Sequence, residues 1–194
     1  MFTGIINHLG KIKTKSKNKL QVECSKDLIN KLSIGASIAI DGICLTVVSL
    51  SKNSFEIDFM PETANRTNIR YLKINDRVNL ELPATPDTFL SGHIVQGHID
   101  GVVKLINITS DENSHILKFS VPTSVSKYIE EKGSIALNGI SLTIIESSRD
   151  YFTVGIIPHT WDKTMLYTLK IGDFVNIEVD ILAKYLKSLL KKEE

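Results

Sequence analysis

The sequence of 194 residues is poor in cysteine, nearly neutral and free of long apolar runs. Its two cysteines, Cys24 and Cys44, lack the close spacing of zinc ligands and the density of a disulfide framework, so we expect a reducing compartment. The 23 Lys and Arg residues nearly cancel the 22 Asp and Glu residues, which removes the electrostatic attraction to nucleic acids and anionic membranes. No apolar segment approaches the ~20 residues that cross a bilayer, and the N-terminus lacks the basic start and apolar stretch of a secretory signal. These absences favour a cytoplasmic protein that binds a small, weakly charged molecule.

Motifs of several enzyme classes are also missing. The sequence contains no G-x-G-x-x-G fingerprint, no Walker-type phosphate loop and no G-x-S-x-G elbow, which argues against dinucleotide, nucleoside triphosphate and serine-hydrolase chemistry. His93 and His98 are five residues apart, a spacing that on a strand directs them to opposite faces, so they do not form a metal-binding pair. We therefore predict neither a metal nor a cofactor.

What the sequence does contain is an internal repeat. The segment SIAIDGICLTVV at 37–48 returns as SIALNGISLTII at 134–145, with 7 of 12 positions identical and an offset of 97 residues. The same offset aligns two further pairs of segments, namely 54–63 with 151–160 and 72–82 with 169–179. A period of this length exceeds the ~50 residues of a solenoid repeat, so each copy is expected to be a domain with its own core.

The two copies begin near the N-terminus and near residue 94. MFTGIIN at the N-terminus matches IVQGHID at 94–100 with an offset of 93 residues, so the second copy carries four extra residues near 111–115. We place this insertion in a surface loop, where extra residues cost little. The predicted domains are residues 1–92 and 93–180.

Within each copy the sequence pattern is that of β-strands. Phe55, Ile57 and Phe59 alternate with acidic residues, and residues 152–156 repeat this period of two. Short strands of this kind, separated by DG, NG, ND and GD turns, number roughly six in each copy. We predict an all-β fold of two tandem six-stranded antiparallel Greek-key barrels, since closure removes the exposed edges of an open sheet. Short helical pieces are expected around 27–32 and 124–129.

The last segment, 181–194, predicts a helix without a counterpart in the first copy. Its large apolar residues recur at helical spacing along one face: Leu182, Tyr185, Leu186, Leu189 and Leu190. Lysines flank this stripe at Lys184, Lys187 and Lys191. The helix can pack either on its own barrel or on copies of itself in an oligomer.

Two equivalent turns bring candidate site residues together. In DGICLT and NGISLT, a glycine turn leads into a strand that leaves Cys44 and Thr46 on one face, and Ser141 and Thr143 on the equivalent face. These faces can line pockets. The alternative is that Cys44 is a small core residue and that the hydroxyl groups bond to the backbone.

Histidines distinguish the copies. His98 aligns with Ile5, so one barrel presents an imidazole where the other presents an alkyl group, although a lone histidine is often structural. His159 aligns with Glu62, which places a polar residue at a strand end twice. We assign surface or structural roles to the remaining histidines, His8, His93 and His115.

Five lysines alternate between residues 11 and 19. On a hairpin they would form a cationic face, which could contact nucleic acid. A charged strand edge that discourages pairing between molecules is the favoured interpretation, given the neutral overall charge and the absence of interleaved aromatics.

Along nearly its whole length the sequence resembles the riboflavin synthase family. The resemblance rests on the opening MFTGII, the paired SIAIDGICLTV and GSIALNGISLTI, VNLE and VNIE, GHIVQGHIDG, the PHT segment and the closing VNIEVDILAKYLKSLL. It implies two lumazine-binding barrels in each chain, a homotrimer held largely by the C-terminal helix, and sites between the N-terminal barrel of one subunit and the C-terminal barrel of its neighbour. Lumazine synthase is a candidate partner.

The resemblance also implies an activity and catalytic residues. Two molecules of 6,7-dimethyl-8-ribityllumazine would react, one donating a four-carbon unit to the other, to give riboflavin and 5-amino-6-(D-ribitylamino)uracil. His98 would transfer protons, and Ser141 with Thr143 would stabilise or attack C7. Cys44 and Thr46 would serve the opposite lumazine.

Substrate-binding residues are implied in the same way, as strand ends whose backbone groups read a uracil-like edge and as side chains that contact the ring or ribityl chain. In the first copy they are Gly4, Ile5, Ile6, Ser37, Cys44, Leu45, Thr46, Asp58, Phe59, Met60, Pro61, Glu62 and Thr63. In the second copy they are Gly97, His98, Ile99, Lys132, Ser141, Leu142, Thr143, Gly155, Ile156, Ile157, Pro158, His159, Thr160 and Asp180.

Two other functions are compatible with a duplicated barrel. A non-catalytic lumazine or flavin carrier, such as an antenna protein, would resemble the enzyme but lose polar residues in the second copy, whereas His98, Lys132, Ser141 and Thr143 are all present. An oligonucleotide-binding barrel is disfavoured by the charge balance and by the lack of stacking aromatics on strands.

Overall fold

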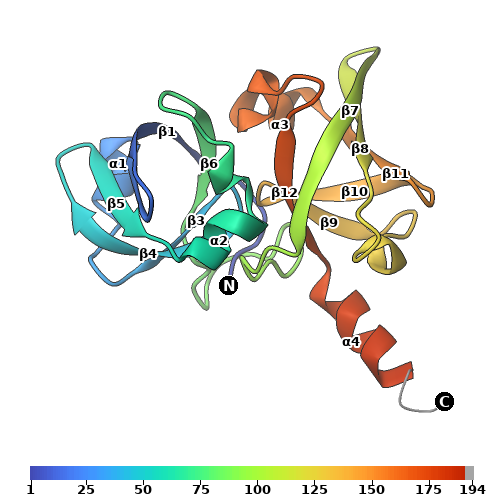
Figure 1. Ribbon diagram of the computed structural model, residues 1–194, viewed down its shortest axis with the longest axis horizontal. Coiled ribbons are helices and arrows are strands. Elements are labelled where there is room, and N and C mark those ends of the chain that lie inside the picture. Colours follow the sequence, from blue (N-terminus) through green and yellow to red (C-terminus); the bar gives the residue numbers. More distant parts are fainter. Residues whose placement is uncertain (191–194) are drawn as a thin grey trace.

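The computed structural model describes residues 1–190 and shows two closed antiparallel barrels side by side, with one helix projecting at the C-terminal end (Figure 1). The strands of the first barrel are β1 (His8–Lys15), β2 (Lys19–Glu23), β3 (Ser37–Ile40), β4 (Ile43–Leu50), β5 (Ser54–Asp58) and β6 (Arg77–Glu81). They pair in the order β1-β2-β5-β4-β3-β6, and β6 pairs with β1 to close the barrel.

The second barrel repeats this topology. Its strands are β7 (Gly101–Asp111), β8 (Ser114–Ser120), β9 (Ser134–Leu137), β10 (Ile140–Ser147), β11 (Tyr151–Ile156) and β12 (Phe174–Val179). They close in the equivalent order, and β9 to β12 each begin 97 residues after β3 to β6. The predicted fold of two duplicated six-stranded barrels is therefore confirmed.

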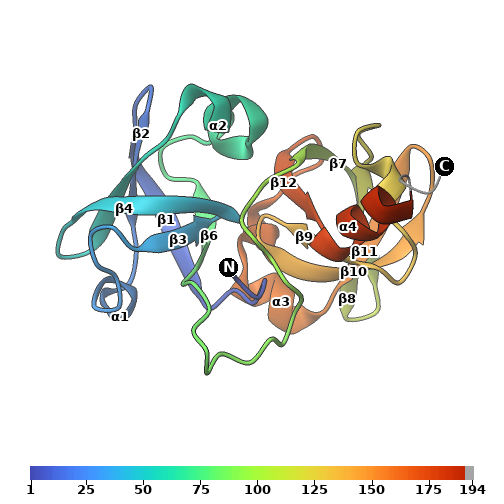
Figure 2. The same cartoon turned by 90° about the horizontal axis from the view of Figure 1, so that it is seen from below.

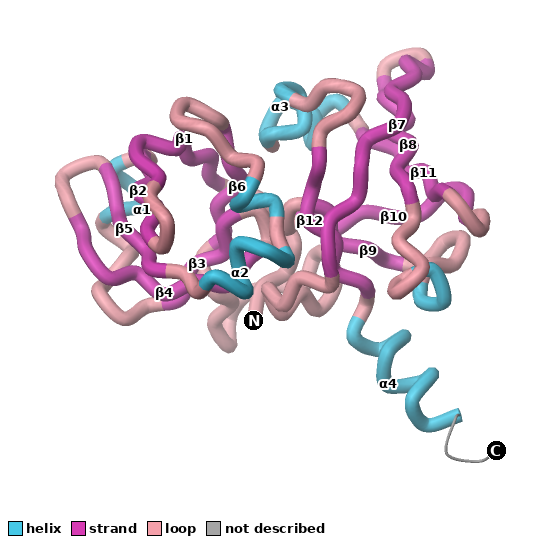
Figure 3. Tube along the Cα trace, in the orientation of Figure 1, coloured by secondary structure: helices cyan, strands magenta, loops and turns pink. Residues whose placement is uncertain are grey.

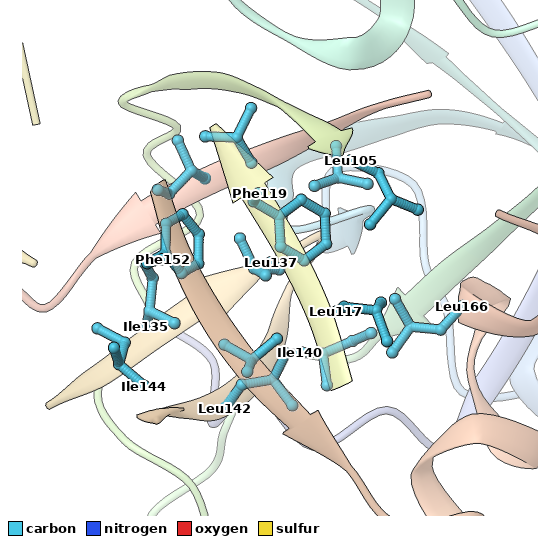
Figure 4. Packing of buried hydrophobic residues seen from close by; sticks show 14 of the residues in the cluster. Leu105, Leu117, Phe119, Ile135, Leu137, Ile140, Leu142, Ile144, Phe152 and Leu166 are labelled. Carbon is cyan, nitrogen blue, oxygen red and sulfur yellow. The ribbon is translucent and has the colours of Figure 1, made fainter. Parts of the chain in front are cut away.

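Each barrel is filled by the inward side chains of its strands. Phe55 and Ile57 of β5 are fully buried, as the period-2 pattern predicts. In the second barrel the rings of Phe119 and Phe152 stack with their centroids 5.6 Å apart, and they lie among leucine and isoleucine side chains (Figure 4). The two cores are separate, so each copy buries enough apolar surface to form its own unit.

The β3–β4 and β9–β10 turns face each other between the barrels. Asp41 and Gly42 have φ values of 46° and 79°, and the equivalent Asn138 and Gly139 have 44° and 77°, which are the left-handed conformations of a two-residue hairpin turn. A Cβ on Gly42 would lie 2.6 Å from the backbone nitrogen of Gly139. Glycine is therefore required for this contact between the turns.

Buried polar groups connect the same region across the barrel boundary. The side chain of Asn79 accepts from the backbone N–H of Met165 at 2.8 Å, and its amide donates to the carbonyl of Asn138 at 2.9 Å. Asn176 of the second barrel makes the reciprocal pair of contacts with the first. This network helps to fix the orientation of one barrel against the other, because the Asn79 and Asn176 side chains bond to backbone groups of the opposite copy.

The helices are short and lie mainly at the ends of the barrels (Figure 3). The predicted helical pieces are present as α1 (Lys26–Ile29) and the 3₁₀ helix η2 (Ser126–Tyr128). Four others were not predicted: α2 (Pro61–Arg66), η1 (Asn68–Arg70), α3 (Pro158–Lys163) and η3 (Met165–Thr168). Glu62 and His159 therefore lie in helices and not at strand ends. The helices α2 and α3 bury no residue, so they show no amphipathic period, and only the proline at the first helical position signals them.

Two further expectations were wrong. The four extra residues of the second copy lengthen the β7–β8 hairpin, which protrudes in Figure 1, and do not form a loop; Asp111 pairs with Ser114 across a two-residue turn that Glu112 enters with φ 50°. The alternating lysines do not guard a strand edge. Both β1 and β2 are paired on both sides, because the barrel is closed.

The C-terminal helix α4 (Ile181–Leu190) extends away from both barrels (Figure 1). Its predicted apolar stripe is exposed, with Tyr185 63 % and Leu189 62 % accessible. The stripe therefore does not pack on the barrel of its own chain. Lys191 and the rest of the predicted segment to residue 194 lie outside the described residues. Among the residues that the structure describes, no helix is long and apolar enough to cross a membrane.

Candidate functional site

The N-terminal segments of the two copies run side by side between the barrels. The backbone of Phe2 pairs with Val95 through hydrogen bonds of 2.7 and 3.1 Å, and the N–H of His93 donates to the carbonyl of Thr3. The N-terminus accordingly lies between the two barrels in Figure 2. Both segments are thereby held against the facing sides of the barrels.

Each segment contacts the barrel of the other copy. The N–H of Ser141 in the second barrel donates to the carbonyl of Gly4 at 2.8 Å, and the N–H of Cys44 in the first barrel donates to the carbonyl of Gly97 at 3.0 Å. Gly4 and Gly97 have φ values of 78° and 81°, and a Cβ on either would lie 2.6 or 2.5 Å from the Cβ of Ser141 or Cys44. The segments are thus exchanged between the copies and are in tight contact with the candidate site residues.

The candidate faces on β4 and β10 point away from the barrel cores. Leu45 is buried in the first core, while Cys44 is half-buried and Thr46 is exposed. The equivalent Ser141 and Thr143 behave in the same way on the second barrel. Cys44 therefore packs outside the core of its barrel, against the small buried cluster that includes Phe2 and Val95, whereas Thr46 and Thr143 are exposed.

Neighbouring strands extend these faces. Ser37 of β3 lies opposite Thr46, just as Ser134 lies opposite Thr143. On the other side, β5 pairs with β4 so that Ile57 is opposite Val47, which brings the predicted segment 58–63 beside the Cys44 face. Residues 155–160, which end β11 and continue beyond it, lie in the equivalent place beside β10.

The exchange decides which predicted residues meet within one chain. His98 and Ile5 are both exposed and follow the glycines that contact the two faces. His98 therefore belongs to the segment on the Cys44 face, and Ile5 to the segment on the Ser141 face. The sequence-based assignment, which set Cys44 and Thr46 apart from His98, did not anticipate this exchange.

The structure also reveals a partner of Ser141 that sequence reasoning missed. The Nδ1 atom of His93 is 2.7 Å from the hydroxyl oxygen of Ser141, and the ring is almost fully buried. Burial lowers the pKa of His93, and the charge of Asp180 opposes this shift, so the imidazole is largely neutral at neutral pH and can accept the hydroxyl proton. The repeat did not single it out, because the aligned segment of the second copy begins at Ile94.

Two buried glutamates hold the exchanged segments. Glu178 accepts hydrogen bonds from the N–H groups of Gln96, Gly97 and His98 at 2.6, 2.9 and 3.0 Å. Burial raises the pKa of Glu178, and these N–H groups oppose that shift.

Glu81 plays the equivalent part for the first segment. It accepts from the N–H and hydroxyl of Thr3, both at 2.7 Å, and from the N–H of Gly4 at 3.2 Å. Burial raises the pKa of this carboxyl too. The repeated VNLE and VNIE motifs were the available signal, since a carboxylate recurs at the buried end of two equivalent strands.

The remaining predicted side chains lie at the margins of the second face. Lys132 is exposed in a left-handed conformation with φ 65°, where the first copy has Gly35 with φ 87°. Asp180 is half-buried and lies close enough to influence the pKa of His93. Both differ between the copies and can distinguish two otherwise similar faces.

The cavities of the chain lie elsewhere. One of about 440 Å³ opens between the barrels beside Tyr71, Lys73 and Phe174, and one of about 420 Å³ lies beside His8 and Glu81. Neither of these two cavities includes Cys44, His98 or Ser141.

The fold defines a duplicated barrel protein with two related faces, each contacted by a segment of the other copy. A family model described as the lumazine binding domain matches residues 3–83 and again residues 96–180, and the chain belongs to this family.

Similar proteins agree with this assignment. The chain is 42 % identical over 197 residues to a riboflavin synthase of Actinobacillus pleuropneumoniae, covering 100 % of the chain and 91 % of that protein. It is 40 % identical to a riboflavin synthase of Photobacterium phosphoreum, covering 98 % of the chain and 89 % of that protein. The crystal structure of LumP with 6,7-dimethyl-8-(1'-D-ribityl) lumazine matches 92 % of the chain and 99 % of its own, at 30 % identity and a TM-score of 0.84. The LumP complex with riboflavin covers the same shares at 30 % identity, with a TM-score of 0.86. The resemblance to riboflavin synthases is confirmed.

Proposed function

We propose that this chain is a riboflavin synthase, which converts two molecules of 6,7-dimethyl-8-ribityllumazine into riboflavin and 5-amino-6-(D-ribitylamino)uracil. The observation that carries the proposal is the pair of related faces, each with its thiol or hydroxyl groups accessible and each completed by an exchanged segment. Full-length similarity to curated riboflavin synthases supports the activity, and similarity to LumP supports lumazine and flavin as ligands.

The reaction suits two similar but unequal sites. Two identical lumazines must meet in opposite orientations, and holding both in place converts a bimolecular encounter into a reaction within one complex. Identical sites would not distinguish the donor of the four-carbon unit from its acceptor. The differences between the copies provide that distinction: the first copy has Cys44 and Ile5 where the second has Ser141 and His98.

The geometry suggests how Ser141 could act. Its hydroxyl oxygen would add to C7 of one lumazine while the proton passes to the neutral imidazole of His93, which is 2.7 Å away. His98 would take a proton from the C7 methyl group of the other lumazine, and the resulting carbanion would form a bond to the activated partner. The Ser141 oxygen would later leave C7 and take its proton back from His93, so that the enzyme is regenerated. Cys44, Thr46 and Thr143 would contact the two rings.

We further propose that the two faces are closed by a neighbouring subunit in a homotrimer. The support is that the apolar stripe of α4 is exposed in the single chain, and that the cavities described above do not include the candidate faces. Association with lumazine synthase and a cytoplasmic location remain predictions, which co-purification and cell fractionation would test.

Incubating the purified chain with the lumazine tests the proposed activity. We expect riboflavin to accumulate in the presence of a metal chelator and without any added cofactor, as measured by chromatography and flavin fluorescence. Cys24→Ala is a matched control, since this half-buried thiol lies outside both faces and its loss should leave turnover unchanged. Tight lumazine binding without riboflavin after prolonged incubation would instead support a carrier.

A further inference from the structure

We propose that Glu178 and Glu81 are positioning residues that act across the barrel boundary: Glu178 sets the segment carrying His98 on the Cys44 face of the first barrel, and Glu81 sets the segment carrying Ile5 on the Ser141 face of the second. The inference rests on the proposed function for its catalytic meaning. Its structural content can be tested separately.

The two carboxylates bind segments that lie outside the regular strands. Residues 93–100 form no regular strand, and apart from isolated backbone hydrogen bonds, such as that from the N–H of Cys44 to the carbonyl of Gly97, they are held by side-chain contacts such as those of Glu178. Three consecutive N–H groups converge on the carboxylate of Glu178. An ionised carboxylate accepts several such bonds at once, and each is stronger than a bond between neutral groups.

The burial of both glutamates indicates that this arrangement is specific. Glu178 is 3 % exposed and Glu81 is 6 % exposed, although a buried carboxylate without partners is strongly unfavourable. Each stands at the end of its last barrel strand, β12 or β6, and points at the segment that leads into that same barrel. Before it enters that barrel, the segment contacts β4 or β10 of the other barrel.

A shift of either segment must reach the site residues directly. The Gly97 carbonyl accepts from the N–H of Cys44, and there is no room for even a Cβ between Gly97 and the Cβ of Cys44. Gly4 is related to Ser141 in the same way. Consequently Glu178, in the second barrel, controls the face on the first, and Glu81 controls the face on the second.

The test uses the reactivity of a thiol on each face, in variants that also carry Cys24→Ala. With Cys44 as the only thiol, Glu178→Gln should speed the labelling of Cys44 by a small aromatic disulfide reagent roughly tenfold. The isosteric amide has one acceptor oxygen fewer for the N–H groups of residues 96–98, so the segment that covers Cys44 should open more often. Glu81→Gln, the matched control of similar burial, should leave this rate unchanged. With Cys44→Ser and Ser141→Cys the pattern should reverse.

Equal acceleration of both thiols by both variants would show general loosening and would overturn the proposal, as would no effect on either thiol. Sedimentation of every sample checks that the assembly is unchanged. Should a variant fail to fold, hydrogen exchange on the unmodified protein decides the matter: the N–H groups of Gln96, Gly97 and His98 should be protected despite lying outside any strand, and rapid exchange would contradict the proposal.

Turnover connects the positioning to the reaction. Each glutamine variant should lower kcat by roughly tenfold or more, because one of the two lumazines is then misaligned. A labelling pattern as predicted in a protein that forms no riboflavin would refute the proposed function and leave the positioning intact. Normal kcat together with altered labelling would refute the positioning role in catalysis.

Discussion

Replacing Asp41 by Asn together with Asn68 by Met should flatten the dependence of stability on pH. Asp41 is fully buried between the barrels, and its carboxylate accepts from the N–H of Asn79 and the amide of Asn68, both at 2.8 Å. Burial outweighs these bonds and raises the pKa of Asp41 to about 7 from its usual 3.8. The double substitution copies the equivalent uncharged pair of the second barrel, Asn138 and Met165.

The sign follows from proton binding in the two states. Between pH 4 and pH 7 the folded chain keeps the proton on Asp41 while the unfolded chain has lost it, so stability falls as pH rises. The contribution is fully present below the unfolded pKa of 3.8 and is lost as pH passes the folded value of about 7. At ~1.4 kcal/mol for each pH unit the whole loss is on the order of 4 kcal/mol, of which about half falls between pH 5 and pH 7, because the slope has already dropped to half at the folded pKa.

Urea unfolding of both proteins at pH 5, 6, 7 and 8 provides the measurement. Relative to the unmodified protein, the variant should become more stable by ~2.3 kcal/mol between pH 5 and pH 7, and the difference should then level off. Comparing the two proteins cancels the other titrating groups, including Glu81 and Glu178, whose pKa values are also raised by burial. Parallel stability curves would refute the assignment of the titration to Asp41.

Three further predictions concern the proposed enzyme. His98→Ala should lower turnover by roughly 10²- to 10⁴-fold, the usual loss for a proton-transfer group, with lumazine binding measured by fluorescence less affected; unchanged turnover would make His98 structural. His93→Gln and Ser141→Ala should each lower kcat, and the double variant should be no slower than the slower single one, since the two side chains act as one unit; additive losses would separate them. Deleting the residues after Ile181 removes an apolar stripe whose side chains each contribute roughly 1.5 to 3 kcal/mol when fully buried, so sedimentation should show folded monomers with reduced specific activity; a fully active monomer would exclude an intersubunit site.

The fold could be predicted because the same pattern of strands and turns occurs in both copies of the repeat. The segments 37–48 and 134–145 share one register, and the strand period is clear around Phe55 and Phe152. The pattern did not show where the four inserted residues lie in the structure or whether the alternating lysines lie on an unpaired strand. A two-residue turn at 112–113 extends the β7–β8 hairpin, and a closed barrel has no edge for the lysines to protect.

The sequence predicted which types of residue form the candidate site, but it did not predict which segments contact one another there. Cys44 and Ser141 stand out because the repeat places small reactive groups at equivalent positions. Their pairing with Gly97 and Gly4 depends on hydrogen bonds between segments far apart in the sequence, which no local pattern encodes. His93 lies just outside the aligned segments of the repeat, so comparison of the two copies gave no reason to assign it a role beyond a structural one.

The transfer of a four-carbon unit between two lumazines is the central claim, and isotope mixing tests it most directly. The substrate would be an equal mixture of unlabelled lumazine and lumazine carrying ¹³C in its two methyl groups and in C6 and C7. If each riboflavin takes one such unit from each of two molecules, mass spectrometry should find unlabelled, half-labelled and fully labelled riboflavin in a binomial distribution, with an equal amount of 5-amino-6-(D-ribitylamino)uracil. Riboflavin without the half-labelled species, or no riboflavin at all, would contradict the account.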